Sequence, residues 1–328
     1  MTSPRQPDSS QFSSTAPSAP TDDASAPRTR TALVLGGGGS TGNAWLIGVI
    51  AGLADVGVDM ARADVIIGTS AGSTTAAQIT SASPAELLAT ILSEAAQHRP
   101  APSGPTGMRP AAGTVVDQMA RTGRIIADAA DAPDLRRKLG AAALDLDAAS
   151  DGEWSARWRG VVAARLAKPR WPERTMLITA VDARTGAAVV FDRHSGVELV
   201  DAVAASTSSG APYHLGDDRY LDGGYRRNEN ADLAAGYDRV VVLSPFGGRS
   251  RYPLEWGMHL GAQVAELQAG GSNVETIFPD GAAEHLFGAN AMDPSLRPPA
   301  ARAGYDQGRN LGERLTGFWQ AARAGGAG

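Results

Sequence analysis

The chain has 328 residues, of which 43% are hydrophobic and 20% are charged, and its formal net charge is −5. This balance gives no sign of the basic face that nucleic-acid binding requires, so we expect no nucleic-acid partner, and it offers no general attraction to anionic membranes. The chain contains no cysteine, which excludes disulfides, thiolate metal sites and cysteine nucleophiles. Its five histidines lack the spacing typical of metal ligands, so we expect neither a metal nor a cofactor.

Residues 1–30 are rich in Ser, Pro, Thr, Ala and Asp and have almost no large apolar side chains. Such a segment buries too little surface to offset its ordering entropy, so we predict a disordered N-terminal tail. No apolar run is long enough to cross a bilayer, and no secretory signal is visible near Met1. We therefore expect a cytoplasmic protein whose contact with membranes is at most peripheral. The sequence leaves the oligomeric state open.

The first folded elements are predicted directly after this tail. Residues 31–35 form an apolar run typical of a buried strand, and residues 40–55 have the pattern of a buried helix. A second short strand is predicted at 65–67 and a helix at 71–81. The Ser-Pro pair at 83–84, followed by an acidic residue, is a typical start signal of a further helix.

The composition changes between residues 100 and 173. Proline and glycine cluster at 100–113, and alanine-rich helical stretches follow at 115–130, 134–144 and 151–167. We predict that residues 100–173 form a helical insertion that acts as a cap beside a functional site. The alternative is that these helices only pack against the rest of the domain.

Strand patterns return after the insertion and alternate with helical ones. The predicted strands are residues 175–180, 187–192, 239–243 and 274–278. The last long helix is predicted at 299–322. Strands that alternate with helices favour a single layered α/β domain, which we place at residues 31–328.

Two glycine-rich turns, each between a predicted strand and a predicted helix, carry the chemistry of the chain. Four glycines at 36–39 provide backbone N–H groups that no side chain blocks. Residues 68–72 read Gly-Thr-Ser-Ala-Gly and match Gly-x-Ser-x-Gly, the sharp turn that lifts the hydroxyl of Ser70 out of a sheet. A nucleophile and preorganised oxyanion donors are the two parts that acyl transfer needs.

The glycine loop alone also fits a dinucleotide-binding turn. Gly37, Gly39 and Gly42 match Gly-x-Gly-x-x-Gly after a strand and before a helix. That interpretation needs an acidic residue at the end of the second strand to bind the ribose. Here the strand at 65–67 runs into Gly-Thr-Ser instead, so the sequence disfavours a nucleotide site.

A conventional α/β-hydrolase is a second alternative. Its catalytic histidine would follow the acidic residue in the chain, and His259 or His285 are the candidates. The serine turn lies on the second predicted strand, directly after the glycine loop, and this order argues against that class. His214 lies near Asp222 in the sequence, but we expect it to have a structural role.

Three motifs follow one another in a fixed order along the chain. They are the glycine loop at 36–42, the serine turn at 68–72 and the Asp-Gly-Gly sequence at 222–224. This order resembles the patatin-like phospholipase family, and residues 204–212 also look like the loop that precedes the aspartate in that family. The likeness spans roughly residues 31–244 and is far more specific than any single motif.

The resemblance implies a three-layer α/β/α fold with a mainly parallel central sheet and a helical insertion. It also implies a Ser–Asp dyad, in which Ser70 attacks an ester carbonyl while Asp222 accepts the serine proton and later activates water. The backbone N–H groups of Gly37, Gly38 and Gly39 would bind the oxyanion. The expected substrate is a lipid or lipid-like carboxylic ester, as in phospholipase A, lysophospholipase or esterase reactions.

The sequence departs from the family pattern at two places. The family usually has an arginine or lysine where this chain has Thr41, and that cation is thought to support the oxyanion loop. After Asp-Gly-Gly the family often has Asn-x-Pro, whereas residues 228–231 keep the asparagine without the proline. These departures motivate an alternative function, a binding or scaffold protein of the same fold with little turnover.

Overall fold

The computed structural model describes residues 29–97, 112–150 and 152–320. The predicted N-terminal tail lies almost entirely outside the described residues. The first part of the predicted insertion, at 98–111, also lies outside them.

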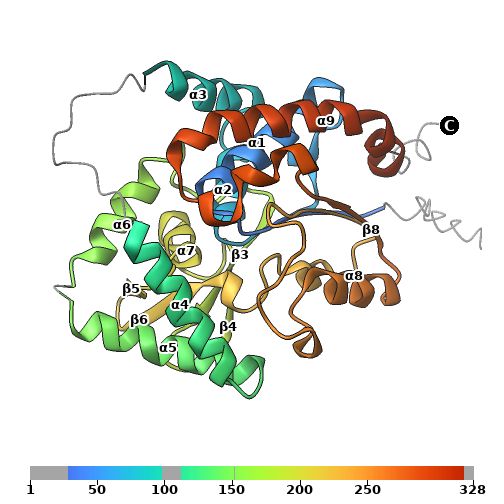
Figure 1. The fold of residues 1–328 in the computed structure, drawn as a ribbon. Helices are drawn as coiled ribbons and strands as arrows, with labels where there is room; N and C mark the ends of the chain where they lie inside the picture. Colours follow the sequence, from blue (N-terminus) through green and yellow to red (C-terminus); the bar gives the residue numbers. More distant parts are fainter. Residues whose placement is uncertain (1–28, 98–111, 151, 321–328) are drawn as a thin grey trace, which may run out of the picture.

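An eight-stranded sheet forms the centre of the molecule (Figure 1). Five strands are parallel neighbours in the order β3-β2-β1-β7-β8, and β4, β5 and β6 extend the sheet beyond β3 in antiparallel pairs. The chain passes from β1 to β2 on one side and returns to β7 on the other side of β1. In open α/β sheets, the crevice at such a switch point is where ligands bind. The strands are β1 (Thr31–Leu35), β2 (Val65–Gly68), β3 (Thr175–Asp182), β4 (Ala188–Phe191), β5 (Tyr213–Leu215), β6 (Asp218–Asp222), β7 (Arg239–Leu243) and β8 (Asn273–Ile277).

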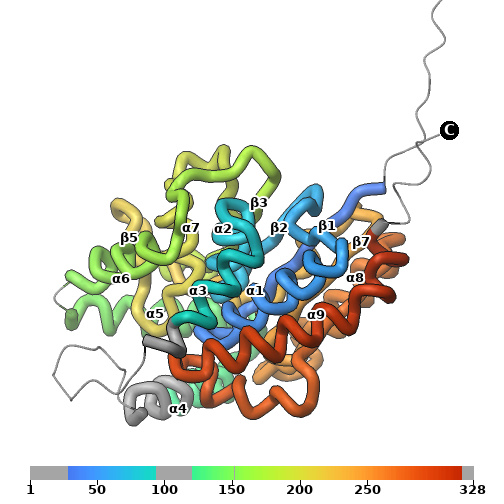
Figure 2. Tube along the Cα trace, turned by 90° about the horizontal axis from the view of Figure 1, so that it is seen from above, coloured from blue at the N-terminus to red at the C-terminus, as the bar shows by residue number. Residues whose placement is uncertain are grey.

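Helices cover both faces of this sheet (Figures 1 and 2). The α-helices of the described residues are α1 (Gly39–Asp55), α2 (Ala71–Ile79), α3 (Pro84–Gln97), α4 (Ala112–Asp128), α5 (Ala132–Ala148), α6 (Trp154–Ala163), α7 (Leu199–Ser206), α8 (Leu260–Ala269) and α9 (Arg297–Gln320). Short 3₁₀ turns connect several of the elements.

Alternate residues of the central strands point to opposite faces of the sheet and create two cores. Leu33 and Leu35 of β1 belong to the core on the side of α1, α2 and α9. Ala32 and Val34 belong to the core on the side of α8 and the 3₁₀ turn η3 (Ala231–Ala234). The resulting three-layer arrangement around a mainly parallel sheet confirms the predicted fold class.

Helices α1 and α9 lie in unusually close contact through glycines. A Cβ atom on Gly48 would lie 2.2 Å from the carbonyl oxygen of Ala301, and one on Gly308 would lie 2.3 Å from the carbonyl oxygen of Val49. No side chain fits at such separations, so the two backbones pack directly against each other. The order of these contacts along both helices shows that α1 and α9 run in parallel.

Helix α5 lies below the antiparallel part of the sheet in Figure 1, and α4 passes in front of it. Helix α5 buries Leu135 and Leu139 against Val181 of β3 and Leu221 of β6. A Cβ atom on Gly140 would lie 2.0 Å from the carbonyl oxygen of Ala183, so the helix packs tightly on the turn after β3. Helix α5 is therefore part of the domain core beside Asp222.

Candidate active site

The register of the strands brings Ser70 and Asp222 to the two sides of β3. Gly68 of β2 pairs with Ile178 of β3 in parallel, so Ser70, two residues later, lies level with Ala180. Asp222, the last residue of β6, pairs with Ala180 from the opposite side. The topology therefore unites two residues that are far apart in the sequence.

The turn between β2 and α2 holds Ser70 in a strained conformation. Ser70 has φ 53° and ψ −117°, a region that costs a residue with a side chain about 1–3 kcal/mol. The backbone N–H of Ser70 donates to Oγ of Ser206 at 3.0 Å. A Cβ atom on Gly72 would lie 1.9 Å from the carbonyl oxygen of Leu35, which explains the glycine after the serine. These contacts fix the turn and leave Ser70 partly exposed.

Asp222 is buried, with 7% of its surface exposed. The N–H of Gly224 donates to Oδ1 of Asp222 at 2.8 Å, and the Ser70 side chain is a second hydrogen-bond partner of the carboxyl group. Burial raises the pKa of Asp222 to about 6, and the two hydrogen bonds, which favour the charged form, limit that rise. A carboxylate with this pKa is ionised at neutral pH and is a stronger base than an exposed aspartate.

The glycine loop connects β1 to α1 and already uses one of its predicted donors. The N–H of Gly37 donates to the carbonyl oxygen of Asn228 at 3.0 Å, so this group is not available to a substrate. The structure thus corrects the expectation for Gly37, because a buried backbone N–H needs a partner within the protein. Within the described residues, the N–H groups of Gly38 and Gly39 donate no hydrogen bond, and they remain the candidate oxyanion donors.

The glycine loop passes directly beside the serine turn. A Cβ atom on Gly37 would lie 3.5 Å from Cβ of Ser70, and one on Gly38 would lie 2.5 Å from Cβ of Pro245. Gly39 has φ 65°, in the left-handed region that favours glycine. The loop is therefore close enough to present N–H groups to an atom bound at Ser70.

Asn230 connects the two halves of the candidate dyad and was not identified from the sequence. Its side chain is fully buried, and its Nδ2 donates to Oγ1 of Thr69 at 3.0 Å and to the carbonyl oxygen of Gly223 at 3.2 Å. Thr69 precedes Ser70, and Gly223 follows Asp222. Asn230 occupies the position of the proline in Asn-x-Pro. Its side-chain hydrogen bonds therefore hold this segment in place where the family has a rigid proline.

Glu229 provides a buried carboxyl group behind the glycine loop. Its Oε1 accepts hydrogen bonds from Nδ2 of Asn228 at 2.8 Å and from Oγ of Ser244 at 2.7 Å. Burial raises the pKa of Glu229. Asn228 also donates to the carbonyl oxygen of Gly37 at 3.3 Å, so this group of side chains fixes the position of the loop.

The histidines lie away from the candidate dyad. His214 pairs with Asp147 of α5 at 2.7 Å, and Nδ1 of His285 lies 3.0 Å from the carbonyl oxygen of Ala282. His259 precedes α8. In the part of the chain that the structure describes, no histidine hydrogen-bonds to either residue of the dyad, which disfavours the conventional α/β-hydrolase hypothesis.

Apolar and aromatic side chains from α4, from the turn after β6 and from the loop after β7 pack against the core that contains Leu221 of β6. Burial raises the pKa of Tyr252, and the charges of Tyr225 and Asp222 raise it further. The residues that pack around this edge of the core, here called the aromatic wall, are Ile125, Ile126, Tyr225, Tyr252 and Trp256. These residues come from three separate segments of the chain, so no local pattern in the sequence predicts that they lie together.

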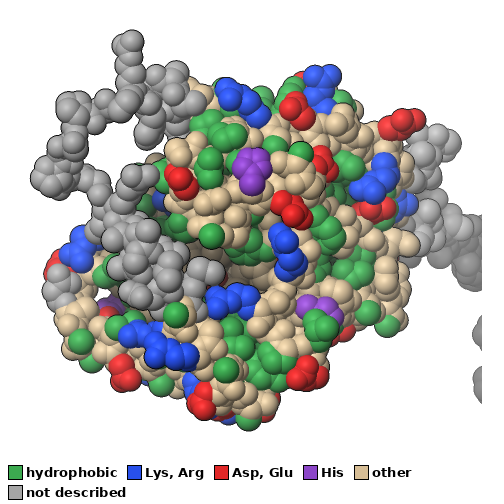
Figure 3. All heavy atoms as spheres, in the orientation of Figure 1, with side chains coloured by type: hydrophobic (Ala, Val, Ile, Leu, Met, Phe, Trp, Pro, Cys, Tyr) green, Lys and Arg blue, Asp and Glu red, His purple; other side chains and the backbone are tan. Residues whose placement is uncertain are grey.

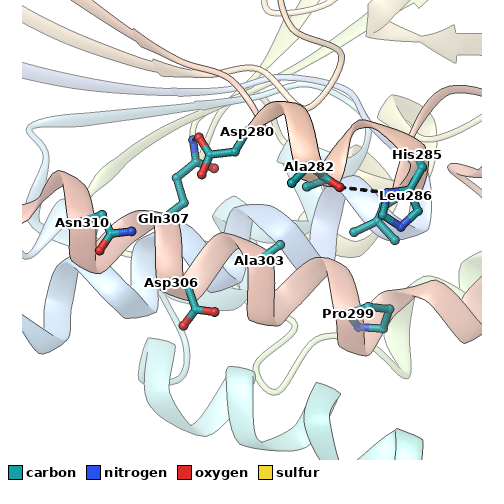
Figure 4. Close-up of a pocket in the computed structure, with 10 residues that line it drawn as sticks. Asp280, Ala282, His285, Leu286, Pro299, Ala303, Asp306, Gln307 and Asn310 are labelled. Carbon is teal, nitrogen blue, oxygen red and sulfur yellow. Dashed lines mark hydrogen bonds between the residues drawn. The ribbon is translucent and has the colours of Figure 1, made fainter.

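Two surface pockets lie apart from these residues. One, of about 330 Å³, lies between α9 and the 3₁₀ turn η5 (Gly281–Leu286) and includes Asp280, His285 and Gln307 (Figure 4). The other, of about 530 Å³, includes Thr80 at the end of α2 and Arg170. Neither pocket is lined by the serine turn, by the glycine loop or by Asp222.

The described residues contain neither a helix that could span a bilayer nor a cluster of His, Asp and Glu side chains suited to a metal ion. On the face shown in Figure 3, acidic and basic side chains are interspersed with apolar ones. This face therefore has no continuous field of one sign.

A serine on a strained strand-to-helix turn, a buried aspartate and a glycine loop at a sheet switch point are features of an α/β hydrolytic enzyme. The sequence model of the patatin-like phospholipase family matches residues 33–235, and the chain belongs to that family. Helix α9, including Arg297, lies beyond the matched residues.

Two solved structures are similar to this chain. VipD from Legionella pneumophila gives a TM-score of 0.39 at 15% sequence identity, over 88% of this chain and 68% of that chain. The type III effector protein ExoU gives a TM-score of 0.37 at 14% identity, over 88% of this chain and 54% of that chain. The chain thus spans about half the length of ExoU. A search of curated proteins gave no match.

Proposed function

We propose that this protein is a serine acyl hydrolase that cleaves carboxylic ester bonds of lipids with Ser70 and Asp222. Membership of the patatin-like phospholipase family supports a lipid hydrolase. The observation that carries the proposal is the buried carboxyl group of Asp222, with its pKa raised to about 6 and with the Ser70 side chain as its hydrogen-bond partner. This arrangement supplies a nucleophile and a base without a histidine.

In the proposed reaction, Oγ of Ser70 attacks the ester carbonyl carbon while the carboxylate of Asp222 takes the serine proton. The negative charge that develops on the carbonyl oxygen is stabilised by the N–H groups of Gly38 and Gly39, each such donor being worth about 10²–10³ in turnover. The tetrahedral intermediate expels the alcohol, which receives the proton from Asp222. Asp222 then deprotonates a water that attacks the acyl-serine. The second tetrahedral intermediate breaks its bond to Oγ of Ser70, which takes the proton back from Asp222, and the fatty acid leaves.

We place the acyl chain of the substrate along the aromatic wall. This surface is apolar, packs against the core that contains Leu221, the residue before Asp222, and is formed partly by α4 of the insertion. Hydrocarbon chains bind such surfaces by burial of apolar area, at about 25 cal/mol per Å². The insertion would then act as the cap that the sequence analysis expects.

Trp256→Ala should lower kcat/KM for a long-chain ester about tenfold more than for a butyrate ester, because only a long acyl chain reaches the indole. The measurement compares p-nitrophenyl palmitate with p-nitrophenyl butyrate. Trp154→Ala is the matched control, since Trp154 is also partly buried but stacks on Trp158 of α6. Equal loss on both esters with the Trp256 variant would contradict a role in acyl binding.

A fluorophosphonate probe tests the proposed function directly. We expect the wild-type protein to be labelled on Ser70 and Ser70→Ala to be unlabelled, because only an activated serine reacts. An ester and phospholipid panel on the same samples then identifies the substrate class. Folded wild-type protein that takes up no label would instead favour the binding or scaffold alternative.

A further inference from the structure

The glycine loop lacks the cation that the family usually carries within it, since position 41 is threonine. Thr41 is fully buried, and its hydroxyl has no hydrogen-bond partner among the described residues. A threonine in this state supplies neither charge nor a polar contact to the loop. Any support for the loop on this side must come from another part of the chain.

Arg297, the first residue of α9, lies against the start of α1. Its Nη1 lies 3.1 Å from the carbonyl oxygen of Ser40 and 3.2 Å from Oδ1 of Asn43, and both atoms accept hydrogen bonds from it. Oγ of Ser40 lies 3.4 Å from the same nitrogen. The guanidinium group thus holds Ser40, which directly follows the four glycines at 36–39.

The segment before Arg297 supports the same loop. The N–H of Thr41 donates to the carbonyl oxygen of Ala291 at 3.0 Å. A Cβ atom on Gly39 would lie 2.7 Å from that carbonyl oxygen, so the two segments are in direct backbone contact. Residues 291–297 therefore form a support, which we call the α9 buttress, behind the proposed oxyanion donors.

The positive charge of Arg297 lies at the N-terminus of α1, where a cation does not stabilise the helix. The N-terminus of α1 carries the positive end of the helix dipole, where an anionic side chain is stabilising and a cation is not. Arg297 therefore supports this end of α1 through its hydrogen bonds to Ser40 and Asn43 and not through a favourable interaction with the helix dipole.

The packing of α9 makes this support rigid. The direct backbone contact of α1 and α9 at Gly48 and Gly308 leaves little freedom for one helix to slide on the other. Arg297 is therefore presented from a fixed position and does not depend on a flexible loop.

We propose that Arg297 is the positioning residue of the oxyanion loop and takes over the role of the family's cation at position 41. The proposal rests on the proposed hydrolase function. Arg297→Ala should lower kcat for p-nitrophenyl butyrate about 10- to 100-fold with less than a threefold change in KM, because the loop moves while the acyl site does not. Arg297→Lys should retain most of the wild-type kcat.

Arg309→Ala is the matched control, since Arg309 lies on the same helix and pairs with Asp55 at the far end of α1, at 3.6 Å. This variant should keep the wild-type kcat. Hydrogen exchange of the peptide that contains residues 38–42 gives a readout independent of turnover, and it should become faster in Arg297→Ala but not in Arg309→Ala. Wild-type kcat in Arg297→Ala, or equal losses in the two variants, would overturn the proposal. If the wild type hydrolyses no ester, the proposed function fails, and the exchange comparison still decides the role of Arg297.

Discussion

Ser70→Ala should reduce ester hydrolysis by about 10³-fold or more, to the level of the uncatalysed background. The variant keeps the glycine loop, Asp222 and the backbone contacts of the turn, so it should fold like the wild type. Initial rates on p-nitrophenyl butyrate and on phospholipid vesicles, with circular dichroism spectra of both proteins, provide the measurement.

Ser81→Ala is a suitable control for this substitution. Ser81 follows the other end of α2, and its Oγ donates only to carbonyl oxygens of that helix, at 2.9 and 3.0 Å. This variant should retain the wild-type rate. Unchanged hydrolysis by the Ser70→Ala protein would rule out Ser70 as the nucleophile.

Asp222→Asn should lower kcat about 10²- to 10⁴-fold, because an amide cannot accept the serine proton. In the wild type, kcat/KM should fall about tenfold per pH unit below about pH 6, where the Asp222 carboxylate becomes protonated. The pH–rate profile of the wild type on a soluble ester measures this dependence. A profile that stays flat down to pH 4 would contradict Asp222 as the base.

The same substitution should stabilise the protein in a pH-dependent way. The folded pKa of Asp222, about 6, lies above the ordinary value of 3.8. Between about pH 4 and pH 6 the unfolded chain releases this proton while the folded protein keeps it, so wild-type stability falls as the pH rises. Above pH 6 the loss stays constant at about 3 kcal/mol, which follows from about 1.4 kcal/mol per pKa unit.

Asparagine has the shape of aspartate and can still accept the hydrogen bond from Gly224, but it carries no charge to bury. The unfolding free energy of Asp222→Asn should therefore exceed that of the wild type by up to about 3 kcal/mol at pH 8 and by almost nothing at pH 4. Urea unfolding at the two pH values tests this difference. Asp218→Asn, on the exposed start of the same strand, is the matched control for placing an asparagine in β6.

Local patterns in the sequence predicted the central elements because their signals are strong. The strands β1 and β7 occupy the predicted residues 31–35 and 239–243, since each is a short run of apolar side chains buried on both faces. The helix predicted from the Ser-Pro pair begins at Pro84, and Oγ of Ser83 accepts a hydrogen bond from the N–H of Glu86 at 3.3 Å. Both signals act within a few residues.

Other elements were missed where burial or long-range pairing decides the structure. Every residue of α7 is buried, so the helix has no exposed face to give an amphipathic pattern, and Ala204–Ser206 were predicted only as part of a loop. The N–H of Gly37 donates a hydrogen bond to the carbonyl oxygen of Asn228, and no sequence pattern near the glycine loop predicts this contact. Arg297 lies 257 positions after Ser40, so only the folded chain brings them together.

The close pairing of α1 with α9 also sets an order for the assembly of the protein. During synthesis the N-terminal part of the chain is made first, so early segments can pack against later ones only after those have been synthesised. The serine turn and Asp222 are synthesised well before Arg297. A growing chain therefore contains both residues of the proposed dyad while its glycine loop still lacks the α9 buttress. On the proposed roles, full hydrolytic activity is acquired only when α9 has been made and has docked.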